Sequence, residues 1–175
     1  MKKIKTTPSV VIRIVLWILM LFGGSVFSIL KDLHHPLFLN IWFHLFSFMI
    51  GSLLLILSFR SAANGGRELA KGRVGDIPRL ETNKLITTGI YACMRHPMLF
   101  GLMLLPLAVA FLLGSPTFIT IVAPLEMFFI LVMILIFEEM EVKKKFGKEY
   151  LIYKKKVSII PKSLKCFKSL FAINK

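Results

Sequence analysis

Acidic residues and cysteines are both scarce in this chain of 175 residues. Only nine residues are Asp or Glu, against 23 Lys and Arg, and the formal net charge is +14. The two cysteines, Cys93 and Cys166, lack neighbours at metal-ligand spacing, so they do not indicate a metal site. The glycine pair Gly65-Gly66 has no preceding strand and no following Gly-Lys-Ser/Thr, which argues against a nucleotide-binding P-loop.

Charged residues are nearly missing from four long apolar runs, at residues 10–30, 38–59, 98–114 and 117–137. A helix needs about 20 residues to cross the hydrocarbon of a bilayer, so each run can span it. With 56% hydrophobic residues, the sequence predicts an all-α integral membrane bundle of about four spans in one domain, residues 1–175. The start MKKIK before an apolar run also fits a signal peptide, but the run is long and lacks an A-x-A-like exit.

The basic residues predict which side of the membrane each segment faces. Three Lys or Arg precede the first run, seven lie in residues 60–97 and eleven follow Phe137, while the short connections hold only Lys31. By the positive-inside rule, both termini and the central loop face the cytoplasm, where thiols stay reduced. This distribution favours a membrane with anionic lipids over nucleic acid as the partner.

The two cytoplasmic segments receive different predictions. Residues 60–78 contain four glycines and a proline, which predicts a flexible connection, followed by a short helix near residues 85–94. After Phe137, apolar side chains recur every three or four residues opposite a row of lysines, at Val142, Phe146, Tyr150, Tyr153 and Val157. We expect this stripe to form a C-terminal helix lying on an anionic membrane surface, bent at Gly147 and ended by Pro161.

Polar residues gather at the predicted cytoplasmic ends of the last two spans. Arg95 and His96 precede the third run, and Glu138 and Glu139 follow the fourth. Such residues are either ordinary interfacial anchors or parts of a site. The tight turn at Ser115-Pro116 predicts a hairpin that brings the two ends together. Cationic, anionic and aromatic groups there suit a zwitterionic, cationic ligand such as S-adenosylmethionine.

The stretch TTGIYACMRHPMLFG, followed about 40 residues later by EEMEVKKKFGKEYLIYKKKVSIIP, closely resembles the isoprenylcysteine carboxyl methyltransferase family and its phospholipid N-methyltransferase relatives. The similarity covers residues 83–161, about half of the chain. It implies a membrane methyltransferase that holds S-adenosylmethionine in a cytoplasmic pocket, without a Rossmann domain. It also implies a lipid or small hydrophobic methyl acceptor that enters from the bilayer.

The resemblance assigns cofactor contacts to residues 83–86 and 96–99 and to Tyr91 and Glu138. Asn83 stands where some relatives have His, and Leu99 where many have Tyr. We expect Glu138 to bind the amino group of the cofactor, Arg95 and His96 to form a polar rim, and tyrosines to form the walls. The cofactor residues are therefore Leu85, Ile86, Tyr91, Arg95, His96, Pro97, Met98, Leu99, Glu138 and Tyr150.

Substrate contacts are expected from Glu139 and Ile134. Prenylcysteine methyltransferases carry an Arg at the position matching Ile134, one helical turn before Glu138, where it meets the substrate carboxylate. An Ile there favours lipid amines, phenols, thiols or small hydrophobic acids over prenylcysteine. Two alternatives remain open: a membrane reductase that uses NADPH, and a non-enzymatic membrane interaction protein.

Two further features have open interpretations. Glu126 lies nine residues into the fourth apolar run, where it either contacts another helix, with His44 as a candidate partner, or lines a route for a lipid substrate. His34-His35 is either an interfacial polar turn or part of a metal site, and no third ligand stands nearby, so we expect no metal.

Overall fold

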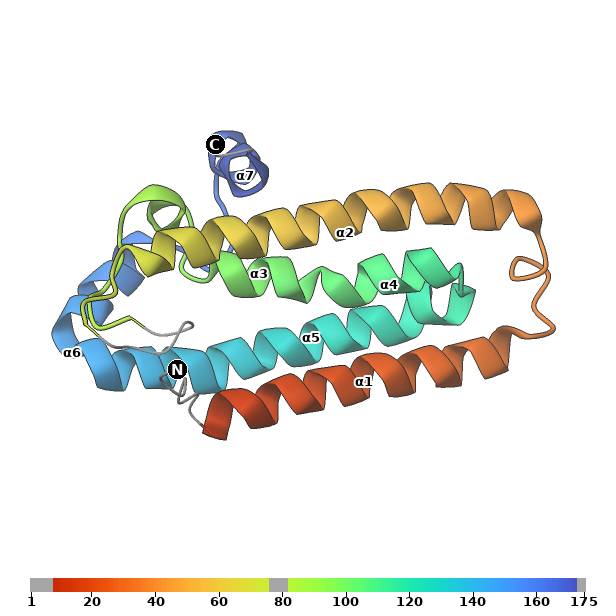
Figure 1. The fold of residues 1–175 in the computed structure, drawn as a ribbon, viewed down its shortest axis with the longest axis horizontal. Coiled ribbons are helices and arrows are strands. Elements are labelled where there is room, and N and C mark those ends of the chain that lie inside the picture. The colour runs from red at the N-terminus through yellow and green to blue at the C-terminus, as the bar shows by residue number, and fades with distance from the viewer. Residues whose placement is uncertain (1–7, 76–81, 173–175) are drawn as a thin grey trace. The chain divides into compact units, whose positions relative to one another are not determined.

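The secondary-structure elements of the protein are all helices, joined by turns and loops, in the part described by its computed structural model, residues 8–75 and 82–172 (Figure 1). Those residues contain no strand, which confirms the all-α prediction. The basic segment 1–7 and residues 76–81 of the central loop lie outside the described residues. The elements are α1 (Pro8–Asp32), α2 (Ile41–Ala70), η1 (Gly89–Ala92), α3 (Pro97–Met103), α4 (Leu105–Leu113), η2 (Phe118–Val122), α5 (Ala123–Met133), η3 (Ile134–Glu138), α6 (Glu139–Lys156) and α7 (Leu164–Phe171).

Among the described residues, three stretches of helix are long and apolar enough to cross a membrane, at Ile12–Asp32, Ile41–Ala70 and Phe118–Lys156. The apolar helix Pro97–Leu113 is shorter and is interrupted at Leu104, between α3 and α4. The interruption precedes Pro106, whose ring prevents regular hydrogen bonding to the preceding turn. In the third stretch, we place the spanning part at residues 118–137, because α6 carries the lysine-rich sequence.

One compact unit comprises the described part of residues 7–58 together with residues 103–132. Within it, α1 packs against α4 and η2, around Ala110, Phe118 and Ala123. The predicted hairpin turn is formed at Gly114, whose positive φ of 60° ends α4. The Asp32 carboxylate accepts a hydrogen bond from the Thr117 amide at 3.0 Å, which fastens the end of α1 to this turn.

Glu126 lies in the same unit and is buried, with 7% of its surface exposed. Its carboxylate lies so close to Gly24 of α1 that a Cβ on that glycine would come within 2.4 Å of Oε1. The imidazole of His44 instead places Nε2 at 2.6 Å from the Phe38 carbonyl oxygen. The structure therefore shows a helix-packing contact for Glu126.

The second unit comprises the described parts of residues 59–102 and 133–175. It holds the end of α2, η1, the start of α3, η3, α6 and α7. Its core is the cluster Ile90, Tyr91, Met94 and Leu170. Because Leu170 belongs to α7, this last helix packs against η1 and closes the core.

Of two predictions about the central loop, one is wrong and the other is confirmed in part. Residues 60–70 continue α2 without a break, although they include Gly65-Gly66. The glycine is required for packing, since a Cβ on Gly65 would lie 2.6 Å from the Met98 amide nitrogen. The short helix predicted near residues 85–94 is present as the 3-10 helix η1, which is shorter because Gly89 at its start adopts a positive φ of 58°.

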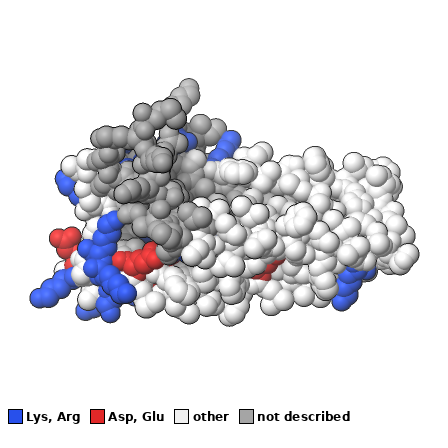
Figure 2. Space-filling view, turned by 60° about the horizontal axis from the view of Figure 1, so that its bottom comes forward, with Lys and Arg blue, Asp and Glu red and all other residues white. Residues whose placement is uncertain are grey.

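The lysine-rich helix α6 bends where the sequence suggested. Gly147 has φ 54° and ψ −124° within it. Of the apolar stripe, Tyr150 and Tyr153 are buried and Val142 and Phe146 are half-buried, whereas the lysines are exposed. In the face drawn in Figure 2, Lys and Arg side chains gather mainly in one place and most of the described surface is uncharged.

Candidate functional site

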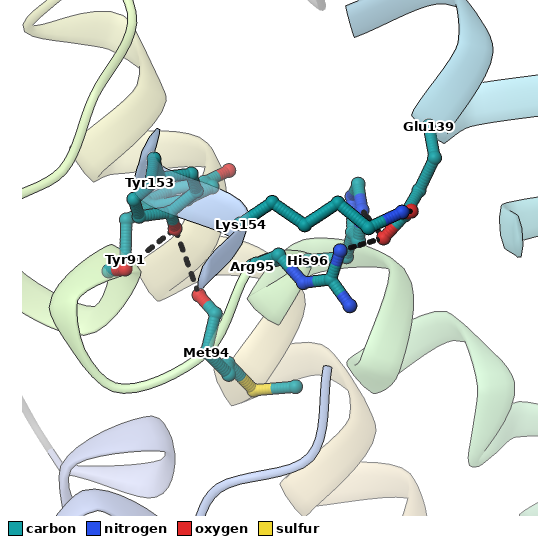
Figure 3. Close-up of polar contacts among 7 residues, drawn as sticks. All are labelled: Tyr91, Met94, Arg95, His96, Glu139, Tyr153 and Lys154. Carbon is teal, nitrogen blue, oxygen red and sulfur yellow. Dashed lines mark hydrogen bonds and ion pairs between the residues drawn. The ribbon is translucent and has the colours of Figure 1, made fainter. Parts of the chain in front are cut away.

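The segment between η1 and α3 is held by hydrogen bonds from α6 and the residues after it (Figure 3). The Tyr153 hydroxyl donates to the Tyr91 carbonyl oxygen at 2.6 Å and lies 3.5 Å from that of Met94. The Arg95 amide donates to the Ser158 carbonyl oxygen at 3.0 Å. These contacts fix the backbone from Tyr91 to Arg95, so the side chains that follow have a defined direction.

Three basic side chains converge on the Glu139 carboxylate (Figure 3). Arg95 and Lys154 form ion pairs with it, and His96 Nε2 lies 3.8 Å from Oε1. The side chains of Arg95 and Glu139 are 9% and 5% exposed, whereas Lys154 reaches the surface. The network therefore runs from a buried ion pair out to solvent.

The basic neighbours of Glu139 decide its protonation state. Burial alone would raise its pKa, but His96, Lys154 and Arg95 outweigh that effect and hold the pKa at about 2. Glu139 is therefore an anion at any pH near neutrality. A fixed anion there orients the Arg95 guanidinium, which is a planar fork of donors suited to a carboxylate or phosphate.

Glu138, the residue before Glu139, is half-buried. Burial raises the pKa of Tyr91 well above its usual range, and the charges of Glu68 and Glu138 raise it further, which places both carboxylates near this tyrosine. The π-helical turn η3 ends at Glu138. Since each residue of an α-helix turns by about 100°, the extra residue of a π turn rotates the helix that follows and points Glu139 at Arg95.

Five buried polar atoms in this region have no hydrogen-bond partner within the described part of the chain. Three of them, on Arg95, His96 and Glu139, belong to the ion pairs, and the other two are Nε of Arg95 and the hydroxyl of Tyr150. The Tyr150 ring is 2% exposed, and Arg95 and Glu139 both influence its titration, so the hydroxyl lies beside the ion pair. Buried donors without partners are costly, and a polar ligand would satisfy them.

The remaining residues named from the sequence lie around this network. Pro97 is fully buried and its carbonyl oxygen accepts from Ser61 of α2 at 2.9 Å, while Met98 packs on Gly65. Ile86 packs against the core cluster, and Leu85 is half-buried. Leu99 and Ile134 are buried apolar residues that bring no charge to the network. The Asn83 amide is used to hold the Val74 backbone, at 3.0 and 2.8 Å.

The cysteines correct a prediction. Cys93 and Cys166 form a disulfide with a Cα–Cα distance of 5.3 Å, so the expectation of two reduced thiols is wrong for this structure. The pairing depends on α7, which brings Cys166 against the residue that follows η1. A helix at Leu164–Phe171 was not foreseen, because eight residues give only two helical turns.

Two residues of the site were not named as site residues from the sequence. Tyr153 was seen only as part of the apolar stripe and Lys154 only as part of a run of lysines. The sequence feature that could have identified them is their spacing along α6. Tyr150 and Tyr153 share its buried face, and Lys154 follows directly.

Comparison with known proteins gives one result. A family model described as phospholipid methyltransferase matches residues 39–149, more than half of the chain. The match runs from before α2 into α6 and includes Tyr91, Arg95, His96, Glu138 and Glu139. No curated protein and no solved structure matches the chain.

Proposed function

Because the chain belongs to the phospholipid methyltransferase family, we propose that it is an S-adenosylmethionine-dependent enzyme that methylates a lipid or another hydrophobic acceptor. The family supports a membrane methyltransferase of the phospholipid and isoprenylcysteine type, and the apolar helices support an integral membrane protein. The cofactor, the acceptor and the cytoplasmic location of the site are parts of the proposal.

The observation that carries the cofactor assignment is the pair of buried donors at Arg95 and Tyr150. S-adenosylmethionine has a carboxylate, an ammonium, a sulfonium and a purine. Arg95 Nε and the Tyr150 hydroxyl suit the carboxylate, and the half-buried Glu138 suits the ammonium. The ring faces of Tyr91 and Tyr150 suit the sulfonium or the purine. The types of group present in the site therefore fit this cofactor.

The same residues have the tasks that methyl transfer requires. The cofactor supplies an activated methyl group, whose carbon–sulfur bond breaks as the acceptor atom bonds to that carbon. The chain must align the two reactants and exclude water, and a base is needed only where the acceptor arrives protonated. Glu139 holds Arg95 in place, so it acts as a positioning residue for the polar rim. The predicted contacts of Glu139 and Ile134 with the substrate remain part of the proposal.

Incubation of the full chain in detergent with methyl-labelled S-adenosylmethionine and a lipid extract from its own membrane tests the activity. A labelled lipid is the expected product, and its structure identifies the acceptor. Absence of any labelled product, combined with saturable binding of NADPH and none of S-adenosylmethionine, would establish the reductase alternative. If liposome binding is the only measurable activity, and it stays intact in Tyr91→Ala, His96→Ala and Glu138→Ala, the non-enzymatic alternative would be favoured.

Equilibrium titration of S-adenosylmethionine tests the assignment of Glu138. We expect Glu138→Gln to weaken binding at least tenfold, because the change removes the charge that faces the ammonium. Glu149→Gln is the matched control, since it removes an exposed carboxylate from the same helix. Equal affinity in Glu138→Gln and the control would remove Glu138 from the site.

A further inference from the structure

A basic pocket opens beside the ion-pair network, at the end of α6. It has a volume of about 440 Å³ and is formed by two short segments together with Arg95. Its cationic residues are Arg95, Lys154, Lys155, Lys156 and Lys162, and residues 157–160 form the rest of its wall. None of its lining residues is acidic, so the pocket concentrates positive charge in one place.

The pocket is built by contacts that hold its inner wall. The Arg95 amide donates to the Ser158 carbonyl oxygen, which fixes the segment after α6 against the start of α3. The guanidinium of Arg95 is about nine-tenths buried, and its Nε has no partner within the described residues. Glu139 neutralises Arg95 and Lys154 in part, whereas no ion pair within the described part of the chain engages Lys155, Lys156 or Lys162.

Large apolar side chains stand exposed on the pocket wall and on the neighbouring parts of α6 and α7. Ile152 of α6, Ile160 in the pocket wall, and Leu164 and Phe167 of α7 are 45–76% exposed. Apolar side chains beside lysines are typical of surfaces that lie at the boundary between headgroups and acyl chains. A phosphate ion in water would not need them, so they favour a lipid as the source of the anion.

We propose that this pocket binds the phosphate of an anionic phospholipid headgroup, with Ile160, Leu164 and Phe167 in contact with its acyl chains. The three lysines that Glu139 does not engage supply the charge and the hydrogen-bond donors, and Arg95 forms part of the inner wall. This is a binding site in addition to the proposed reaction, and it does not depend on methyl transfer. The bound lipid would hold the α6–α7 segment against the membrane beside the Arg95 ion pair.

Native mass spectrometry of the full chain in detergent tests the proposal. The probes are phosphatidylglycerol and phosphatidylcholine with the same acyl chains. We expect preferential retention of phosphatidylglycerol, weakened about tenfold or more by the combined substitutions Lys155→Ala, Lys156→Ala and Lys162→Ala. The matched control combines Lys143→Ala, Lys144→Ala and Lys148→Ala, which removes the same charge from exposed positions of α6 outside the pocket.

The site is specific if the control variant keeps its preference for phosphatidylglycerol. Equal loss in the pocket and control variants would overturn the proposal, because the attraction would then belong to the overall charge of α6. Displacement of the lipid by millimolar inorganic phosphate, with no preference between the two lipids, would make this a free-phosphate site and would overturn the lipid assignment. Since the readout is lipid retention, absence of methyl transfer would not affect the result.

Discussion

Arg95 and Glu139 form a buried ion pair that joins the start of α3 to the start of α6. Both side chains are at least about nine-tenths buried, so each charge depends on the other for its solvation. Lys154 extends the pair to the surface. The ion pair therefore couples the candidate site to the stability of the unit that carries it.

Glu139→Gln should lower stability strongly. Removing one partner of a buried ion pair costs about 3–5 kcal/mol, because the other charge stays buried without compensation. Thermal unfolding in detergent measures the change. Glu149→Gln serves as the control, since its carboxylate is exposed on the same helix and its loss should shift the unfolding temperature little.

The double variant Arg95→Met with Glu139→Gln gives a second test of the same pair. The double variant should lose less unfolding free energy than the two single variants together, by about 0.5–3 kcal/mol. Each single variant leaves one buried charge without its partner, whereas the double variant removes both charges. Additive costs would mean that the two residues act independently.

Tyr153→Phe should lower the stability of the protein, whereas Tyr150→Phe should lower its affinity for the cofactor. The Tyr153 hydroxyl donates to a buried carbonyl oxygen, so its removal should cost about 1–3 kcal/mol of unfolding free energy. The Tyr150 hydroxyl has no such partner among the described residues, so Tyr150→Phe should keep stability and weaken binding of S-adenosylmethionine. Thermal unfolding and cofactor titration of both variants make the comparison, and a destabilised Tyr150→Phe with normal affinity would contradict it.

Gly65→Ala should destabilise the protein, whereas Gly66→Ala should not. A Cβ at position 65 would meet the Met98 amide nitrogen at 2.6 Å, and backbone atoms cannot move aside cheaply. A Cβ at position 66 finds only the end of the Met98 side chain, at 4.0 Å. Alanine also favours the helix by about 1 kcal/mol over glycine, so Gly66→Ala should be neutral or stabilising. Unfolding temperatures of the two purified variants decide the matter.

Purified protein should show a covalent link between Cys93 and Cys166. Peptide mapping without reductant should recover the two cysteines in one linked peptide pair. Removing the link with Cys166→Ser should cost stability, typically about 2–4 kcal/mol for a disulfide. α7 should stay attached at lower stability, because the Asn64 amide also donates to the Leu170 carbonyl oxygen at 2.8 Å. Mapping that finds only free thiols under oxidising conditions would contradict the pairing.

The helical class and the apolar runs were predictable because they depend on local composition. A run of about 20 uncharged residues forms a helix in a membrane whatever its neighbours are, since its backbone groups find no other partners. The bend at Gly147 was likewise predictable from one residue. The extent of α2 was not predictable. A Gly-Gly pair usually interrupts a helix, but Gly65-Gly66 lies within α2, where Gly65 allows close contact with Met98.

Some residues of the candidate site were likewise predictable from the sequence, and others were not. Arg95, His96, Glu138 and Glu139 were identifiable as polar residues at the ends of apolar runs. The sequence did not show which of the two glutamates pairs with Arg95, because the π turn η3 rotates the helix that follows it. Lys154 and Cys166 were assigned no role in the site, because their partners are distant in sequence.

The sequence by itself determined a helical membrane protein with a basic, aromatic C-terminal helix and a family motif, since hydropathy, charge and periodicity act over a few neighbouring residues. Only the tertiary structure decided that Glu139 faces Arg95, that α7 is tied to the residue after η1, and that five cations share one pocket. Those results depend on helix rotation and on contacts between distant segments, and no local pattern in the chain encodes them.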